Sequence, residues 1–386
     1  MRASGVQVGG KEIVHDRFVK TRSARPLPTS RGIPEVKGLV VFVGAAILLG
    51  SEIWPQAAPP APLTGFSYSP LISTQANRNP ADDLGLLLAS TSPDVVRLPV
   101  YWDAVQPAPD RLDFTSVDQL LSTVEQHNLT SERQTRVVLT IGARNFLYPE
   151  LHAPTWAGPR QQPELGEIQS GPIYRLYFDA SILRYRASPL IYAWQVENEP
   201  FDDTANADTG NDRIDATQLA WEMGEVRRLD PGHDAYTTTY DGWNVSIDML
   251  QIYAPPLLDA LHAYPSGHPQ NALDAGDALG LDLYIYGPKV PPSYISNSQR
   301  AEWKAQALSY WADRAGAEGK QVWLAEMQAQ PWGNLSGFGP ADLIDSALDY
   351  RQARLGVVLL WGVDTWLSNP AWLAAANEAQ TILRSG

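Results

Sequence analysis

The chain has no cysteine among its 386 residues and only six histidines. Without thiols there is no disulfide framework, no cysteine-ligated metal and no thiol nucleophile. The histidines show no HExxH or similar spacing, so the usual metal-ligand patterns are missing as well. We therefore predict neither a metal ion nor another cofactor.

Positive charge is scarce outside the N-terminal segment. Residues 1–37 contain eight Lys or Arg and three Asp or Glu, and the whole chain carries −14, which leaves −19 for the remainder. Nucleic acid binding needs a basic surface, so the acidic body excludes nucleic acid as a partner. The acidity is explained by solubility as readily as by any substrate.

The hydrophobic run GLVVFVGAAILLG at 38–50 is short. It has 13 residues, whereas a spanning helix needs about 20. It fits the core of a signal peptide, or an anchor if flanking residues extend it. We favour an uncleaved anchor, with the basic segment 1–37 cytoplasmic by the positive-inside rule. A buried core helix is the alternative. Residues 51–62 then form a Pro/Ala-rich linker, and residues 63–386 an exported, extracytoplasmic domain.

Eight short, apolar, β-rich runs follow, and their continuous hydrophobicity is typical of parallel strands buried on both faces. Amphipathic stretches such as 117–127, 216–229, 298–316 and 341–355 separate them. This alternation predicts a single closed (β/α)8 barrel. An open doubly wound sheet is the alternative, but no G-x-G-x-x-G follows the first strand. The predicted strands are 63–68, 95–100, 136–142, 190–196, 235–240, 279–286, 321–326 and 356–361.

Active sites of such barrels lie at the C-terminal ends of the strands. There the fourth strand ends in Glu197, Asn198 and Glu199, and the seventh ends in Glu326. Two carboxyl groups on opposite sides of one barrel are what glycoside hydrolysis needs, because one must protonate the leaving oxygen and the other must attack the sugar or activate water. Polar or aromatic residues also end other strands: Arg97, Tyr101 and Trp102 on the second, Asp282, Tyr284 and Tyr286 on the sixth, and Trp361 and Asp364 on the eighth.

Five stretches resemble the retaining glycoside hydrolases of the large clan with glutamates on strands four and seven, and most closely the cellulase-like family 5. They are VRLPVYWDAVQPAPDRLDF (96–114), WQVENEP (194–200), LGLDLYIYGP (279–288), VWLAEMQAQPW (322–332) and LLWGVDTW (359–366).

The resemblance implies that Glu199 is the acid/base and Glu326 the nucleophile. It also implies that Asn198 binds the sugar 2-hydroxyl. The residues Arg97, Tyr284 and Trp361 match further members of the family pattern. Two stretches depart from it: Arg144 and Asn145 stand where the third strand usually ends in histidine, and Asp282-Leu-Tyr replaces His-x-Tyr on the sixth.

Aromatic residues in the loops after the strands are candidate sugar platforms, because a flat ring can stack on a sugar. We assign Trp102 and Trp332 to substrate binding with Trp361, and prefer Tyr284 to Tyr286 as a partner of Glu326. The role of Glu197 stays open between a secondary contact and a structural ion pair.

The sequence thus predicts a membrane-anchored or secreted glycosidase that cleaves β-linked oligo- or polysaccharides with retention of configuration. Two alternatives are a non-catalytic carbohydrate-binding barrel at the cell surface, and a transglycosylase that uses the same residues.

Overall fold

The computed structural model describes residues 60–157, 171–202, 214–287, 295–333, 335 and 337–386. The predicted basic segment, the hydrophobic run and nearly all of the linker lie outside these residues. Among the helices that the structure does describe, none is both long and apolar enough to cross a membrane.

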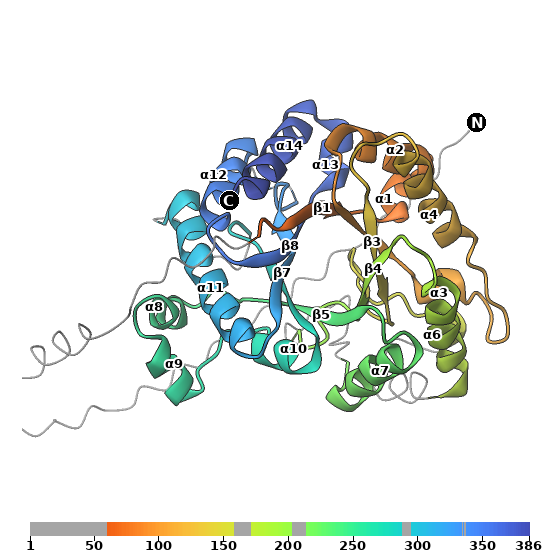
Figure 1. Cartoon of the computed structure of the whole chain (residues 1–386), viewed down its shortest axis with the longest axis horizontal. Helices are drawn as coiled ribbons and strands as arrows, with labels where there is room; N and C mark the ends of the chain where they lie inside the picture. The colour runs from red at the N-terminus through yellow and green to blue at the C-terminus, as the bar shows by residue number, and fades with distance from the viewer. Residues whose placement is uncertain (1–59, 158–170, 203–213, 288–294, 334, 336) are drawn as a thin grey trace, which may run out of the picture. The chain divides into compact units, whose positions relative to one another are not determined.

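Eight parallel strands close into a barrel in sequence order, with the first strand paired to the last. This confirms the predicted (β/α)8 architecture. Figure 1 shows the described helices arranged around the ring of strands. The strands are β1 (Leu63–Ser67), β2 (Val95–Pro99), β3 (Arg136–Ile141), β4 (Ile191–Val196), β5 (Asp234–Tyr240), β6 (Ala278–Leu283), β7 (Gln321–Gln328) and β8 (Leu355–Trp361).

Several helices begin at a polar cap followed by proline. The side chains of Ser69, Asn79 and Asn369 accept backbone N–H groups of the first turn, and the proline after each supplies a helical φ without needing its missing donor. The α-helices are α1 (Pro70–Gln75), α2 (Pro80–Thr91), α3 (Trp102–Val105), α4 (Thr115–Asn128), α6 (Pro172–Tyr185), α7 (Ala216–Leu229), α8 (Val245–Tyr253), α9 (Pro255–Leu261), α10 (Pro269–Ala275), α11 (Asn297–Ala317), α12 (Pro340–Tyr350), α13 (Val363–Ser368) and α14 (Pro370–Arg384).

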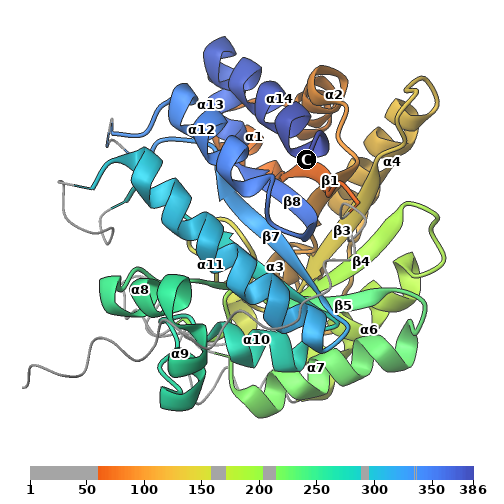
Figure 2. The same cartoon turned by 60° about the vertical axis from the view of Figure 1, so that its left-hand side comes forward.

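The buried apolar side chains form two separate clusters, and strand residues alternate between them. The larger cluster lies between strands and helices; Figure 2 shows α11 crossing the outer side of β7, which it contacts. The smaller cluster, with Trp323 against Tyr236 at 4.7 Å between ring centroids, fills the barrel interior.

On several strands, the next inward-facing residue after the interior apolar cluster is polar. Arg97 follows Val95, Gln195 follows Ala193 and Thr238 follows Tyr236, with Val95, Ala193 and Tyr236 in the interior cluster. Because side chains of a strand alternate with a period of two, these polar residues form a layer inside the barrel above the apolar one. This layer lies toward the C-terminal ends of the strands, called the barrel mouth below.

Candidate active site

Glu326 on β7 is held by Arg97 on β2. Arg97 is 0% exposed, and its Nη2 donates to Oε1 of Glu326 at 2.6 Å. The other two guanidinium nitrogens also donate, Nε to Ser67 Oγ at 2.8 Å and Nη1 to Gln195 Oε1 at 3.0 Å. This fixed fork keeps one oxygen of Glu326 in place next to a permanent positive charge.

The second oxygen of Glu326 accepts a hydrogen bond from the Tyr284 hydroxyl at 2.5 Å. The sequence predicted a strand to 286, but β6 ends at Leu283. Beyond it the backbone N–H groups of Ile285 and Tyr286 donate to the side chain of Gln328 instead of to a strand. The ladder therefore ends early, and Tyr284, as predicted, rather than Tyr286 reaches Glu326.

Asn198 presents its amide group in a fixed orientation. Its Oδ1 accepts from Gln195 Nε2 at 3.0 Å and from Thr238 Oγ1 at 3.2 Å. Its side chain also hydrogen-bonds to the carboxyl group of Glu150, so the amide nitrogen faces that residue. An Asn held in this way offers N–H groups as donors at the mouth.

Glu199 follows at the end of β4 with a positive φ of 44°, and its backbone N–H donates to Thr238 Oγ1 at 3.1 Å. Burial raises the pKa of its carboxyl well above the ordinary value, and the negative charges of Glu150 and Asp282 raise it further. A carboxyl group with a raised pKa keeps its proton near neutral pH and can act as a general acid.

Glu197 does not share the mouth with Glu199. Its φ is +60°, and its fully buried carboxyl accepts the backbone N–H groups of Ala143 at 2.9 Å and Arg144 at 2.5 Å. It also hydrogen-bonds to Glu222 of α7, and burial followed by the Glu222 charge raises the pKa of Glu197 well above its ordinary value. Its role is structural, as a carboxyl pair rather than an ion pair. Gly142 gives it space, because a Cβ there would lie 2.4 Å from Cδ of Glu197.

Arg144 and Glu150 form an ion pair beside Glu199. The Arg144 Nε also donates to the backbone oxygen of Asn198 at 2.8 Å, which ties the end of β3 to the end of β4. Burial raises the pKa of Glu150 to about 7, against the lowering effect of Arg144. Arg144 stands out in the sequence as a departure from the family pattern, whereas Glu150 was not predicted, because it lies in a loop with no recognisable motif.

The three predicted tryptophans lie in different places. Trp361 is half-buried at the end of β8, with its ring centroid 5.9 Å from the Arg97 guanidinium. Trp332 is 43% exposed and meets the Tyr284 ring edge-on at 5.2 Å. Trp102 is fully buried among Trp156, Tyr174 and Tyr177. The structure therefore places Trp361 against Arg97 and Trp332 against Tyr284, the two partners of Glu326, and buries Trp102 among aromatic side chains with no exposed surface.

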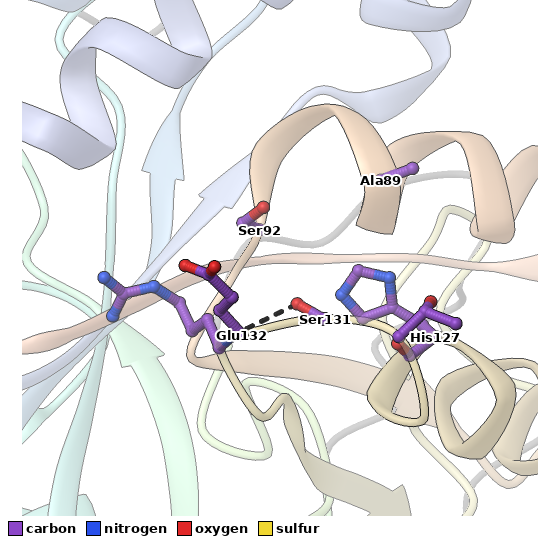
Figure 3. Close-up of a pocket in the computed structure, with 7 residues that line it drawn as sticks. Ala89, Ser92, His127, Ser131 and Glu132 are labelled. Carbon is purple, nitrogen blue, oxygen red and sulfur yellow. Dashed lines mark hydrogen bonds between the residues drawn. The ribbon is translucent and has the colours of Figure 1, made fainter.

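Two cavities lie at opposite ends of the barrel. One of about 40 Å³ lies beside Trp361 at the mouth. An open depression of about 820 Å³ lies at the other end, between α2 and the turn after α4 (Figure 3). None of the residues discussed above contributes to this depression, which is lined by Ala89, Ser92, His127, Thr130, Ser131, Glu132 and Arg133. We therefore place the candidate active site at the mouth.

Comparison with solved structures supports the (β/α)8 fold. GH5_18 from Streptomyces cattleya, solved with GlcNAc, matches with a TM-score of 0.55 at 17% identity, over 78% of this chain and 70% of that one. GH5_18 from Bifidobacterium longum subsp. infantis matches with 0.56 at 13% identity, over 83% and 79%. At these identities the likeness establishes the fold, and the chain resembles glycoside hydrolases of this kind.

Similarity in sequence covers a much shorter part of the chain than the similarity in fold. Mannan endo-1,4-beta-mannosidase F from Aspergillus clavatus is 33% identical over 82 residues, which is 21% of this chain and 17% of that enzyme. The chain therefore matches less than a fifth of this curated relative. No protein-family model matches the chain.

Proposed function

We propose that the protein is a retaining glycoside hydrolase of β-linked sugars. The observation that carries the proposal is the unequal surroundings of its two glutamates. Glu326 accepts hydrogen bonds from a guanidinium and a phenol, as suits an ionised nucleophile, whereas burial raises the pKa of Glu199, as suits a proton donor. Such unequal carboxyl groups support an acid and a nucleophile in one site.

In the first step Glu326 attacks the anomeric carbon while Glu199 protonates the departing oxygen, which gives a glycosyl ester on Glu326. In the second step Glu199, now ionised, removes a proton from water as the water attacks the same carbon and releases Glu326. The sugar keeps its β configuration because the carbon is inverted twice.

Azide rescue tests the two roles separately. With a 4-nitrophenyl β-glycoside, Glu326→Ala should lose turnover, and azide should restore it with an α-glycosyl azide as product. Glu199→Ala with azide should give a β-glycosyl azide, because the ester on Glu326 still forms. Full activity of Glu326→Ala, or an α-anomeric first product from the wild type, would contradict the mechanism.

β-Mannosides are the first substrates to test. The Streptomyces cattleya protein was also solved, as a variant, with Manb1-4GlcNAc, and an exo-beta-1,4-mannosidase from Opitutaceae bacterium strain TAV5 matches with a TM-score of 0.50 at 17% identity, over 78% of this chain and 51% of that one. These likenesses guide the choice of substrate, together with the short mannosidase match above.

One observation favours a non-catalytic sugar-binding barrel as the second candidate. Glu326 is 6% exposed and paired with Arg97, which is also how a purely structural carboxylate would be held. Sugar binding by the wild type without any hydrolysis would favour this candidate. A transglycosylase would instead transfer the sugar to an added alcohol in preference to water.

We also propose that residues 63–386 act outside the cytoplasm, tethered or released by the N-terminal segment. The proposal rests on the basic residues and hydrophobic run of the sequence. Protease treatment of intact cells that express the full chain would digest an exported domain and would spare a cytoplasmic one.

A further inference from the structure

Asp282 is a third carboxyl group on the inner wall of the barrel. Its Cα pairs with that of Glu326 on the neighbouring strand β7. Residues paired in this way in a parallel sheet point to the same face, so both side chains face the barrel interior. Asp282 is 1% exposed. Its charge contributes to the raised pKa of Glu199, which places it near both proposed catalytic residues.

The Asp282 carboxyl is bonded only weakly by the protein around it. Neither of its oxygens has a hydrogen bond of good geometry among the described residues. The Thr238 hydroxyl is close enough to lower the pKa of Asp282 by hydrogen bonding, but its single hydrogen is shared with Oδ1 of Asn198, which lies at 3.2 Å. Arg97 lowers the pKa of Asp282 through its charge, but its hydrogen bonds go to Ser67, Gln195 and Glu326.

Such a group is costly in a folded protein. Burying a carboxyl without strong hydrogen bonds opposes folding, so nearly all buried polar side chains have partners, and an exception needs an explanation, of which a role at a functional site is one. Arg97, Gln195 and Asn198 in the same polar layer all have theirs. A group that is only weakly bonded beside two catalytic candidates is suited to take its partners from a ligand.

The chemistry of Asp282 fits a hydroxyl group as that partner. Burial, and then the negative charge of Glu326, raise the pKa of Asp282 well above its ordinary value. A protonated carboxyl can donate one hydrogen bond and accept others, and a sugar hydroxyl can do the same.

We propose that Asp282 is a substrate-binding residue whose carboxyl group exchanges hydrogen bonds with one hydroxyl group of the sugar held between Glu199 and Glu326. The inference rests on the proposed function for the position of that sugar. It adds a contact that neither Asn198 nor the tryptophans supply.

Asp282→Asn and Asp282→Leu test the proposal, with Asp230→Asn as the matched control. Asp230 is a buried carboxyl that precedes β5 at the other end of the barrel, and it has two partners, Trp194 Nε1 and His233 Nδ1, each at 2.8 Å. Loss of a hydrogen bond to the substrate should lower kcat/KM for 4-nitrophenyl β-mannoside by about 10- to 150-fold in both Asp282 variants. The control should change kcat/KM by less than about 3-fold, consistent with a site remote from the chemistry.

Two further readouts separate binding from a structural role. Removal of a weakly bonded buried carboxyl should leave Tm unchanged or raise it, so Asp282→Leu should lose activity without losing stability. With the 2-, 3- and 6-deoxy mannosides, the wild type should lose affinity for the one that lacks the contacted hydroxyl, and Asp282→Asn should show no further loss with that substrate. An equal loss with every deoxy substrate, or unchanged kcat/KM, would overturn the proposal.

Calorimetric titration with β-1,4-mannobiose keeps this proposal distinct from the proposed function. If the wild type hydrolyses no glycoside yet binds mannobiose, and Asp282→Asn does not bind it, the hydrolase assignment fails and the role of Asp282 stands. If hydrolysis occurs but both proteins give the same titration and the same kinetics, the hydrolase stands and the role of Asp282 fails. Identical titrations without hydrolysis count against both.

Discussion

Nη2 of Arg97 lies 2.6 Å from Oε1 of Glu326, so a side chain of β2 fixes a side chain of β7 across the barrel mouth. Both partners are buried. Removing one partner of such a pair leaves the other charge buried without water or a counter-charge. This destabilises the fold by more than the intact pair stabilises it.

Arg97→Met should therefore destabilise the fold by about 3–5 kcal/mol, since Glu326 would remain buried without its cation. Urea unfolding measures this change. Ser67→Ala is the control, because it removes only one acceptor of Arg97 and should cost about 1 kcal/mol. If the two variants lost the same unfolding free energy, the ion pair would contribute no more to stability than the hydrogen bond to Ser67.

Tyr284→Phe should lower kcat by about 10- to 100-fold while changing unfolding free energy by less than about 1.5 kcal/mol, the size of one hydrogen bond. The substitution removes only the hydroxyl that donates to Glu326 Oε2. Tyr286→Phe removes a hydroxyl that is not bonded to Glu326 and should stay within about 2-fold of wild type. If Tyr286→Phe were the slower variant, the wrong tyrosine would have been assigned.

Glu150→Gln should shift the alkaline limb of the kcat/KM profile to lower pH. Glu199 must be protonated to act as an acid, so activity falls as pH rises through its folded pKa. After burial, the Glu150 charge is the largest effect that raises the pKa of Glu199, and its removal should lower that pKa. Asp345→Asn on the exposed face of α12 should leave the limb in place. A shift to higher pH would show that Glu150 acts in some other way.

Glu222→Gln should flatten the dependence of stability on pH. Burial raises the pKa of Glu222 from 4.5 to about 7. Between these values the folded state binds more protons than the unfolded state, so the unfolding free energy of the wild type should fall as pH rises from 4.5 to 7. Glutamine does not titrate, and the difference in urea stability between pH 5 and pH 8 should shrink. An unchanged difference would exclude Glu222 as a source, and Asp345→Asn again serves as the control.

Trp332→Ala should raise KM by about 2- to 12-fold through loss of ring stacking, with little change in stability. Trp332 is exposed at the mouth, whereas Trp102 is fully buried. Trp102→Phe should show the opposite result: an unchanged KM and a lower Tm, because it leaves a hole among packed rings. If both variants raised KM alone, Trp102 would belong to the substrate site after all.

The barrel and its central residues could be predicted because they follow from strand periodicity. Eight buried runs define eight strands, and parallel strands bring their C-terminal ends to one mouth, so Arg97, Glu199 and Glu326 meet there. The same alternation gave a wrong expectation for the direction of the Glu197 side chain. Regular alternation would put it on the side of Glu199, but the left-handed φ at both residues turns the chain, and a turn of this kind leaves no trace in hydrophobic periodicity.

Other residues of the candidate site could not be predicted from the sequence, or were given no role there, for physical reasons. Gln195 and Thr238 complete the hydrogen bonds of Asn198, and the only signal for them is a polar residue at an inward position of an apolar strand. Asp282 gave the same signal within LGLDLYIY, where it is the only charged residue. Glu150 comes from a loop that is held by its ion pair with Arg144 and by backbone hydrogen bonds such as Asn145 N–H to the Glu150 oxygen at 2.8 Å, and no repeat in the sequence marks these contacts.

The geometry around Gly142 limits how this site can change. Its φ of +126° is rarely adopted by other residues, and a methyl group there would displace the carboxyl of Glu197. Glu197 binds the turn after β3 and lies one residue before Asn198 and two before Glu199. A side chain at residue 142 would therefore have to displace the carboxyl that joins the turn after β3 to the residue before Asn198.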